Sequence, residues 1–375
     1  MRRFFAALAC LAAGIFIGLW LRRPVPAPPA AVIPAPAPAV ALPPLPPPAP
    51  GLACQVAASF HGNIYPSLVL SLGASHPEYA RCLALEIDHA AADKPCEVRI
   101  ECNLFQAPFF LSALPGSERW TLHPDLPWNY DALRRSTQTL PVLFVVSASS
   151  GGRTTQATLT CVVHPVNEVV SRIYDHAAGA WQDTSICFAA FVNEDHPWIN
   201  QLLQEALAQG GVTRFSGYEF GQVSVAEQMQ AIWAALASRH LSYVDLGTVS
   251  TADVSDVATQ YVRFLDQSVR DQGANCVDAS VLIAAIFRRI GLRPVLVFRP
   301  GHCFVAVYDS AAGGQLLALE TTLLGSSSFS AALVYGAQEL QNTTANLGTP
   351  GYSLVDIGTA RAQGVRPIAY AEGGP

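Results

Sequence analysis

The chain has 375 residues, of which 51% are hydrophobic and only 13% are charged, and its formal net charge is −6. This apolar content is enough for one large or two ordinary globular domains, and it excludes an extended disordered protein. The arginines are scattered and no surplus of positive charge is present to neutralise phosphates, so a nucleic acid is not an expected partner.

Residues 1–23 contain an apolar run from Phe4 to Leu21 between two pairs of arginines. A helix that spans a bilayer needs about 17–25 residues, so this run is long enough. A cleaved signal segment is the alternative, but its apolar part is usually about 7–15 residues long and ends at small residues. This run ends at Trp20 and Leu21. We therefore expect a single-pass membrane anchor with the globular part outside the cytoplasm, in the periplasm if the source is Gram-negative.

Residues 24–52 are rich in proline and alanine. Proline has no amide proton and a fixed backbone angle, so this segment can form neither a helix nor a strand ladder. We expect a stiff spacer of the polyproline type, which rises about 3.1 Å per residue. The anchor and the spacer together predict a globular body that is held away from a membrane.

Residues 53–166 show short alternating runs that are typical of an antiparallel β-sandwich. The runs are SLVLSLGA, CEVRIECNLF, LPVLFVVSAS and TTQATLTCVV, with Gly151 and Gly152 between the last two. Each of Cys102 and Cys161 sits in one of these runs, and their separation resembles the inter-sheet pair of immunoglobulin domains. The usual packing tryptophan and the tyrosine before the second cysteine are missing from their places.

Cysteine usage leaves two interpretations open for this β domain. Outside the cytoplasm disulfides are permitted, so a pairing is expected among five cysteines, although the sequence does not fix the connectivity. The alternative is that each is a buried free thiol. The five are Cys54, Cys82, Cys96, Cys102 and Cys161.

At the start of residues 167–375 the apolar residues change to helical spacing. HPWINQLLQEALAQGG has helical spacing, SVAEQMQAIWAALASRH opens with a capping-box pattern at Ser224 and Glu227, and DVATQYVRFLDQSVRDQG gives a third amphipathic segment. Two strands are then expected, PVLVFRPGHCFVAVYDS and QLLALETTLLG, with a turn at Gly313 and Gly314 between them. Trp181, Trp198 and Trp233 lie within apolar patterns and are predicted to be core residues.

Cys276 stands between this third helical segment and the two strands, where the chain enters the apolar helix pattern CVDASVLIAAIFRRIG. A helix N-terminus carries partial positive charge, which favours a thiolate and supplies free amides for an oxyanion. His302 and Cys303 should point to opposite faces of their strand, so a His302 that faces Cys276 leaves Cys303 in the core. Glu320, on the next strand pattern, can then orient the imidazole of His302.

Three further residues near this arrangement have more modest interpretations. Asp278 is interpreted as a helix-start charge and Asn275 as a helix cap that can also orient the site. Gln272 is a candidate oxyanion donor on position alone. A zinc site of His302, Cys303 and Glu320 is disfavoured because adjacent strand residues point apart. No metal and no cofactor are therefore expected.

Spacing alone is also compatible with an ordinary packed core, because buried cysteines are common on apolar helices. The stretch GANCVDASVLIAAIFRRIGLRPVLVF, followed by PGHCFVAVY and LALETT, resembles the transglutaminase-like superfamily, in which Cys, His and an acid follow in this order. The lead-in QYVR at Gln260 to Arg263 is similar to that of bacterial members. The acid here is Glu where Asp is usual, and Val277 follows the cysteine where animal transglutaminases have Trp.

The resemblance implies an α+β fold, with a transglutaminase-like (papain-like) domain after the immunoglobulin-like β domain. It implies that Cys276 is the nucleophile, His302 the base and Glu320 the acid. The expected function is a membrane-tethered thiol acyl-transfer enzyme that hydrolyses or transamidates amide or peptide bonds of an envelope substrate. The alternative is a catalytically silent module of the same fold that binds a protein or cell-wall partner.

Overall fold

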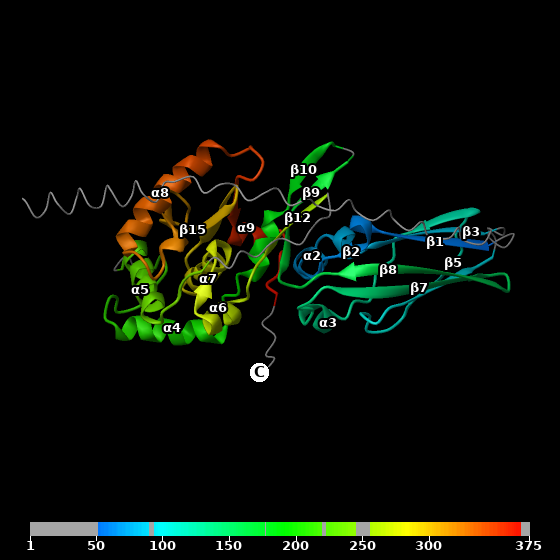
Figure 1. Cartoon of the computed structure of the whole chain (residues 1–375), viewed down its shortest axis with the longest axis horizontal. Coiled ribbons are helices and arrows are strands. Elements are labelled where there is room, and N and C mark those ends of the chain that lie inside the picture. The colour runs from blue at the N-terminus through cyan, green and yellow to red at the C-terminus, as the bar shows by residue number, and fades with distance from the viewer. Residues whose placement is uncertain (1–51, 90–93, 177, 220–222, 245–255, 369–375) are drawn as a thin grey trace, which may run out of the picture. The chain divides into compact units, whose positions relative to one another are not determined.

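The computed structural model describes residues 52–89, 94–176, 178–219, 223–244 and 256–368, which fold into a mixed α+β structure with several sheets (Figure 1). The predicted anchor and nearly all of the predicted spacer lie outside these described residues. Within the described ranges, no helix combines the length and the apolar character that a membrane crossing requires.

Two antiparallel-rich sheets make up the β-rich part of the chain and share one apolar core. The five-stranded sheet has the order β2-β8-β7-β4-β5, and the three-stranded sheet has the order β1-β3-β6. The strands are β1 (Leu52–Ala58), β2 (Asn63–Ile64), β3 (Leu83–His89), β4 (Cys96–Glu101), β5 (Phe109–Ala113), β6 (Arg119–Leu122), β7 (Leu140–Ser150) and β8 (Arg153–Val163). Two short helices, α2 (Pro66–Leu72) and α3 (Tyr130–Arg134), accompany them.

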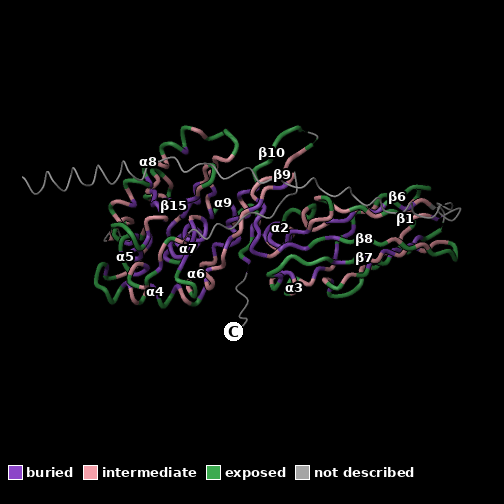
Figure 2. Tube along the Cα trace, in the orientation of Figure 1, coloured by how far each residue is buried: buried purple, intermediate pink, exposed green. Residues whose placement is uncertain are grey.

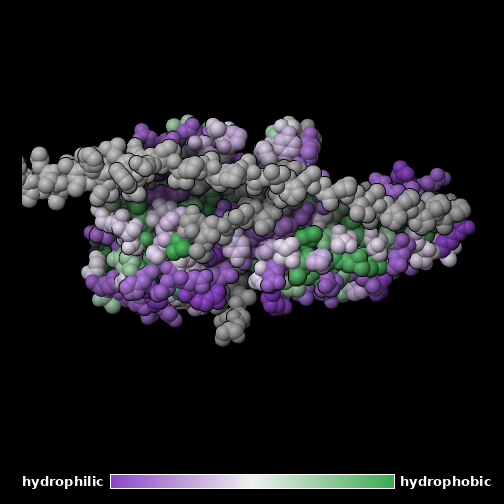
Figure 3. Space-filling view, viewed as in Figure 1, coloured by the Kyte–Doolittle hydropathy of each residue, from purple (hydrophilic) through white to green (hydrophobic). Residues whose placement is uncertain are grey.

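The long β7–β8 hairpin shows why the alternating pattern was informative. Gly151 and Gly152 have φ angles of 56° and 78°, which only glycine adopts without strain, and they form the tight turn. Buried and exposed residues alternate along β7, so one face packs into the core. Its other face leaves Leu143 half-exposed, and Figure 3 shows apolar residues gathered over β7 and β8.

Strands are confirmed at three of the four predicted runs, and the fourth prediction is wrong. SLVLSLGA lies almost entirely in helix α2, which Pro66 starts at its first position. The buried residues Leu68 and Leu72 of this helix belong to the second apolar core, together with residues far along the chain. Leu68 and Leu72 are four residues apart, so a helix places both on one face. Burial of both leucines in this core favours the helix over the strand that the alternation predicted.

The disulfide expected in the β-rich part is not formed, because all five of its cysteines are free thiols. Cys102 follows the end of β4 and Cys161 lies on β8, and both strands belong to the same sheet. The two cysteines therefore cannot bridge two sheets as the immunoglobulin pair does. Cys96 and Cys161 are instead buried as small apolar side chains of the core.

The rest of the chain combines helices with a four-stranded antiparallel sheet of order β16-β15-β14-β17. Its strands are β14 (Pro294–Arg299), β15 (His302–Tyr308), β16 (Leu316–Leu319) and β17 (Ser353–Asp356). The helices are α4 (Pro197–Ala208), α5 (Val225–Ser238), α6 (Leu265–Asp271), α7 (Cys276–Arg289), α8 (Phe329–Ala345) and α9 (Ile357–Ala362). Helix α7 is buried along nearly its whole length and packs against β15 (Figures 1 and 2).

Three predictions for this part of the chain are corrected by its shorter strands and by a hairpin. β9 (Glu168–Asp175) pairs with β10 (Ala180–Asp183) and with β12 (Val257–Tyr261), while β11 (Ser242–Tyr243) pairs with β13 (Gly273–Ala274). The change to a helical period at residue 167 was therefore placed too early, and the segment predicted as a third amphipathic helix is β12 followed by α6. The run predicted as one strand from Pro294 is the β14–β15 hairpin, because Pro300 and Gly301 form its turn.

The three tryptophans expected in the core differ in their surroundings. Trp233 is buried on α5 and Trp198 is partly buried against the same core. Trp181, on β10, is 41% exposed, so its core prediction is wrong. The capping box of Ser224 and Glu227 at the start of α5 is confirmed.

Gly336 on α8 lies so close to β16 that a side chain there would collide with the sheet. A Cβ atom would lie 2.5 Å from the carbonyl oxygen of Ala318. We expect Gly336→Ala to lower the free energy of unfolding by about 1–3 kcal/mol, because α8 must move away from β16. Gln338→Ala, at an exposed position of the same helix, should change it by less than about 0.5 kcal/mol. Urea denaturation of both variants tests this, and equal stability of Gly336→Ala and the parent chain would contradict the close packing.

Candidate active site

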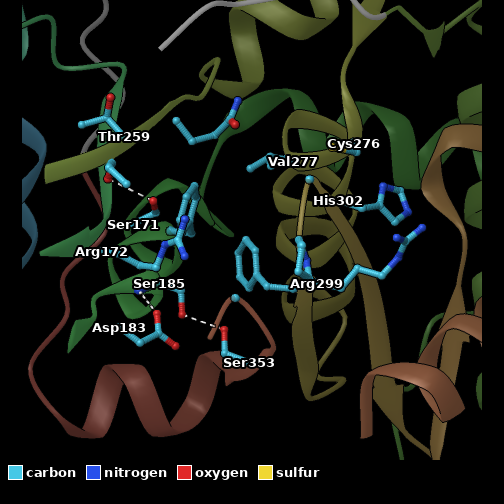
Figure 4. A pocket seen from close by; sticks show the side chains of 17 residues that line it. Ser171, Arg172, Asp183, Ser185, Thr259, Cys276, Val277, Arg299, His302 and Ser353 are labelled. Carbon is cyan, nitrogen blue, oxygen red and sulfur yellow. Dashed lines mark hydrogen bonds between the residues drawn. The ribbon is translucent and has the colours of Figure 1, made fainter. Parts of the chain in front are cut away.

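A cavity beside the start of α7 brings together segments that are far apart in the sequence (Figure 4). Cys276 and Val277 of α7 and His302 of β15 line one side. Residues of β9, β10 and β12 line the other, among them Arg172 and Gln260. Phe188 and Phe298, whose rings lie 4.8 Å apart, give the cavity an apolar part.

Cys276 is the first residue of α7, as predicted, and Asn275 is the cap of this helix. The side chain of Asn275 accepts a hydrogen bond from the Asp278 amide at 2.9 Å, and Asp278 accepts one from the Asn275 amide at 3.1 Å. Asn275 is therefore used in capping. The first amides of a helix have no partner within the helix, so the start of α7 brings amide groups and partial positive charge next to Cys276.

Asp278 fixes the beginning of α7 to the segment that follows β12. It is buried, accepts a hydrogen bond from the Arg263 amide at 2.8 Å, and lies 3.4 Å from the Arg263 guanidinium. Burial raises the pKa of Asp278 in spite of these hydrogen bonds, which favour its charged form. The arginine of the QYVR lead-in thus has a structural partner that sequence reasoning did not identify.

His302 is the first residue of β15 and lies directly after the hairpin turn. Its Nε2 atom lies 2.8 Å from Oε2 of Glu320, so Nδ1 is the ring nitrogen left for Cys276. Burial by itself lowers the pKa of His302, but its interactions with Cys276 and with the Glu320 carboxylate outweigh this effect and raise the pKa to about 9. The geometry thus favours an imidazolium between a thiol and a carboxylate.

Glu320 lies one residue beyond β16 and caps the 3-10 helix η4 (Thr321–Leu323). Its Oε1 atom accepts hydrogen bonds from the Thr322 amide at 3.0 Å and from the Thr322 hydroxyl at 2.6 Å. Burial acts to raise the pKa of Glu320, but the hydrogen bonds from His302 and Thr322 prevail and hold it below its usual value. Thr322 therefore keeps the carboxylate charged and oriented toward His302.

The other predicted residues do not face the cavity. Cys303 is fully buried in the apolar core, and burial raises its pKa well above the usual value. Gln272 has a left-handed backbone with a φ of 50°, and its side chain donates to the Arg239 carbonyl at 3.3 Å. Gln260 of β12 lines the cavity instead. Its strand was predicted as helix, which is why this residue was missed.

A largely buried hydrogen-bond network supports the wall that carries Gln260. Nδ1 of His164 lies 2.9 Å from Glu168, and Nε2 lies 2.8 Å from Oδ1 of Asn63, whose Nδ2 donates to the Phe60 carbonyl. Each ring nitrogen of His164 therefore has one hydrogen-bonding partner, and the imidazole joins Asn63 to Glu168. Glu168 also accepts a hydrogen bond from Thr259, which lines the cavity, at 2.7 Å. The β-rich part thus supports the cavity wall through β9 and β12.

The described part of the chain contains no candidate metal site. No cluster of three His, Cys, Asp or Glu side chains there has an arrangement that could hold an ion.

Comparison with known proteins finds distant structural similarity. No family model matches the chain, and no curated protein matches it. Part of the chain is similar in structure to a putative cysteine protease from Cytophaga hutchinsonii, with 14% sequence identity and a TM-score of 0.23. The match covers 62% of this chain and 65% of that chain, which is less than two thirds of the length of that protein.

Proposed function

We propose that this protein is a cysteine-dependent acyl-transfer enzyme that acts on amide or peptide bonds through Cys276, His302 and Glu320. One observation carries the proposal: Glu320 holds Nε2 of His302 at 2.8 Å while Cys276, at the start of a helix, raises the pKa of the same imidazole. A thiol, an imidazole and a carboxylate that act on one another in a cavity form a nucleophile, a base and an orienting group.

The reaction would proceed through a thioester. The Cys276 sulfur attacks the substrate carbonyl, and the oxyanion is stabilised by amides at the start of α7. His302 gives its Nδ1 proton to the leaving amine as the C–N bond breaks. His302 then takes a proton from the incoming water or amine, which attacks the thioester and releases Cys276.

Hydrolysis is the favoured outcome because the wall opposite Cys276 is rich in hydroxyl groups. The cavity is lined by Ser171, Ser185, Thr259 and Ser353 (Figure 4). The hydroxyl oxygens of Ser185 and Ser353 lie 2.9 Å apart. Hydroxyl oxygens of such a wall can accept hydrogen bonds from water that enters the cavity. Transamidation would require an amine to displace this water.

The proposed fold of residues 167–375 is transglutaminase-like. Its support is the order of a helix that begins at Cys276, an antiparallel strand that begins at His302 and a strand that ends beside Glu320. Residues 53–166 are proposed as an immunoglobulin-like sandwich, supported by two sheets with one core. The apolar run and the proline-rich segment before them support a membrane-tethered body outside the cytoplasm, with peptide-containing envelope material as its substrate.

Labelling with a thiol-reactive peptide, such as a peptidyl chloromethyl ketone, tests the nucleophile. We expect modification at Cys276, because it lines the cavity next to an imidazolium, and loss of labelling in Cys276→Ser. Cys303→Ser is the matched control and should keep labelling, since Cys303 is fully buried. Peptide mapping by mass spectrometry gives the site. Modification at Cys303, or labelling that persists in Cys276→Ser, would refute the assignment.

The pH dependence of peptide hydrolysis tests the role of His302. Because its pKa is raised to about 9, the imidazolium persists through neutral pH and is lost as pH rises through about 9. We expect kcat/KM for peptide hydrolysis to fall over that range.

Glu320→Gln should move this alkaline limb to lower pH. The substitution removes a charge that raises the pKa of His302 and leaves the opposing effect of burial. Glu339→Gln is the control, because Glu339 pairs with Arg299, whereas His302 pairs with Glu320. The kcat/KM profiles of the three proteins, with NMR titration of His302, give the measurement. An unshifted limb in Glu320→Gln would contradict the orienting role.

A further inference from the structure

One arginine of the cavity wall has no function in the reaction described above. Arg172 of β9 is half-buried and lines the same cavity as Cys276 and His302. Figure 4 shows it between Ser171 and Ser185, on the side opposite Cys276. Its position therefore matches a group that contacts the substrate some distance from the reacting carbonyl.

The hairpin β9–β10 holds this guanidinium in place. Strand register pairs Arg172 with Asp183 and Tyr174 with Trp181, which places all four side chains on one face. The guanidinium carbon lies 5.5 Å from the centre of the Trp181 ring, and Tyr174 packs against the same ring at 5.5 Å. A cation stacked on an aromatic face keeps its edge free for hydrogen bonds. The exposure of Trp181 is explained if this residue supports a binding group.

The charges around the cavity leave Arg172 as the cation that a ligand can use. Arg299 pairs with Glu339 at 2.7 Å, and His302 pairs with Glu320. Asp183 accepts a hydrogen bond from the Ser185 amide at 2.8 Å and forms no ion pair with its cross-strand neighbour Arg172. Within the ranges that the structure describes, no carboxylate pairs with Arg172.

We propose that Arg172 is a specificity-determining residue that binds a carboxylate of the substrate, so that the preferred substrates are acidic peptides. The proposal rests on the proposed acyl-transfer function. A planar guanidinium donates two parallel hydrogen bonds to a carboxylate, and partial burial strengthens this pairing. The carboxylate is either an acidic side chain or the C-terminus of the peptide, since both present the same group to Arg172.

A protection experiment with the full chain distinguishes these sources without requiring turnover. Iodoacetamide alkylates Cys276, and the concentration of each peptide that halves the rate is measured. The reference is acetyl-alanyl-glutaminyl-alanine amide, which is neutral. The first test peptide replaces glutamine with glutamate, and the second replaces the C-terminal amide with a free carboxylate.

We expect at least one acid to protect at about a tenfold lower concentration than the neutral reference, as a charge-assisted hydrogen bond implies. Arg172→Gln should abolish this ratio and Arg172→Lys should retain part of it. Arg299→Gln is the matched control, since it removes a cation of the same cavity that already has a partner, and the ratio should survive. Taking the ratio of acid to neutral peptide cancels any change in the reactivity of Cys276.

Three outcomes would overturn the proposal: equal protection by acids and the neutral peptide, no protection by either acid, or an acid preference that persists in Arg172→Gln. None of these outcomes depends on catalysis. The proposed function fails separately, if Cys276 forms no acyl adduct although acidic peptides bind through Arg172.

Discussion

The contact between the start of α7 and the start of β15 is the constraint on which the site depends. Helix α7 is buried along one side of the four-stranded sheet, so the position of its first residue relative to the sheet is fixed by packing. Cys276 then meets His302, the first residue of its strand. Glu320 completes the row from the end of the neighbouring strand, where Thr322 fixes its carboxylate. The ends of three packed elements thus set the geometry.

This arrangement also gives two adjacent residues, His302 and Cys303, different surroundings. Alternation along β15 directs His302 to the cavity and Cys303 into the core. A thiol in the core is protonated, because burial penalises the thiolate. The thiol at the helix start lies instead beside an imidazolium and unpaired amides. The two thiols therefore lie in different environments, Cys303 in the core and Cys276 at the cavity.

The sequence allowed the three central residues to be placed, because each lies at the end of a strongly patterned element. It did not allow the opposite wall to be placed. Arg172 and Gln260 lie on β9 and β12, which pair across about ninety positions of sequence, and short strands of mixed polarity have a period that is easily taken for a helix. Gln272 was chosen for its nearness in sequence to Cys276, but the left-handed turn at this residue directs its side chain to Arg239.

The disulfide prediction failed for a related reason. Counting cysteines indicates how many pairs are possible, but pairing depends on sheet membership, and β4 and β8 belong to one sheet. The same limit applies to the His164–Glu168 pair, which links the end of β8 to β9 and supports the cavity wall through Thr259. Its partners, Asn63 and Thr259, lie about a hundred residues before and after it in the sequence, so no local sequence pattern predicts this pair.

Intact-mass measurement after brief exposure to an activated acyl ester tests the central claim most directly. If Cys276, His302 and Glu320 act as one unit, the chain will gain one acyl group, the adduct will map to Cys276, and hydroxylamine will remove it as expected for a thioester. Cys276→Ser will gain none under the same conditions. An unmodified chain, or an adduct on another residue that survives hydroxylamine, would contradict the account.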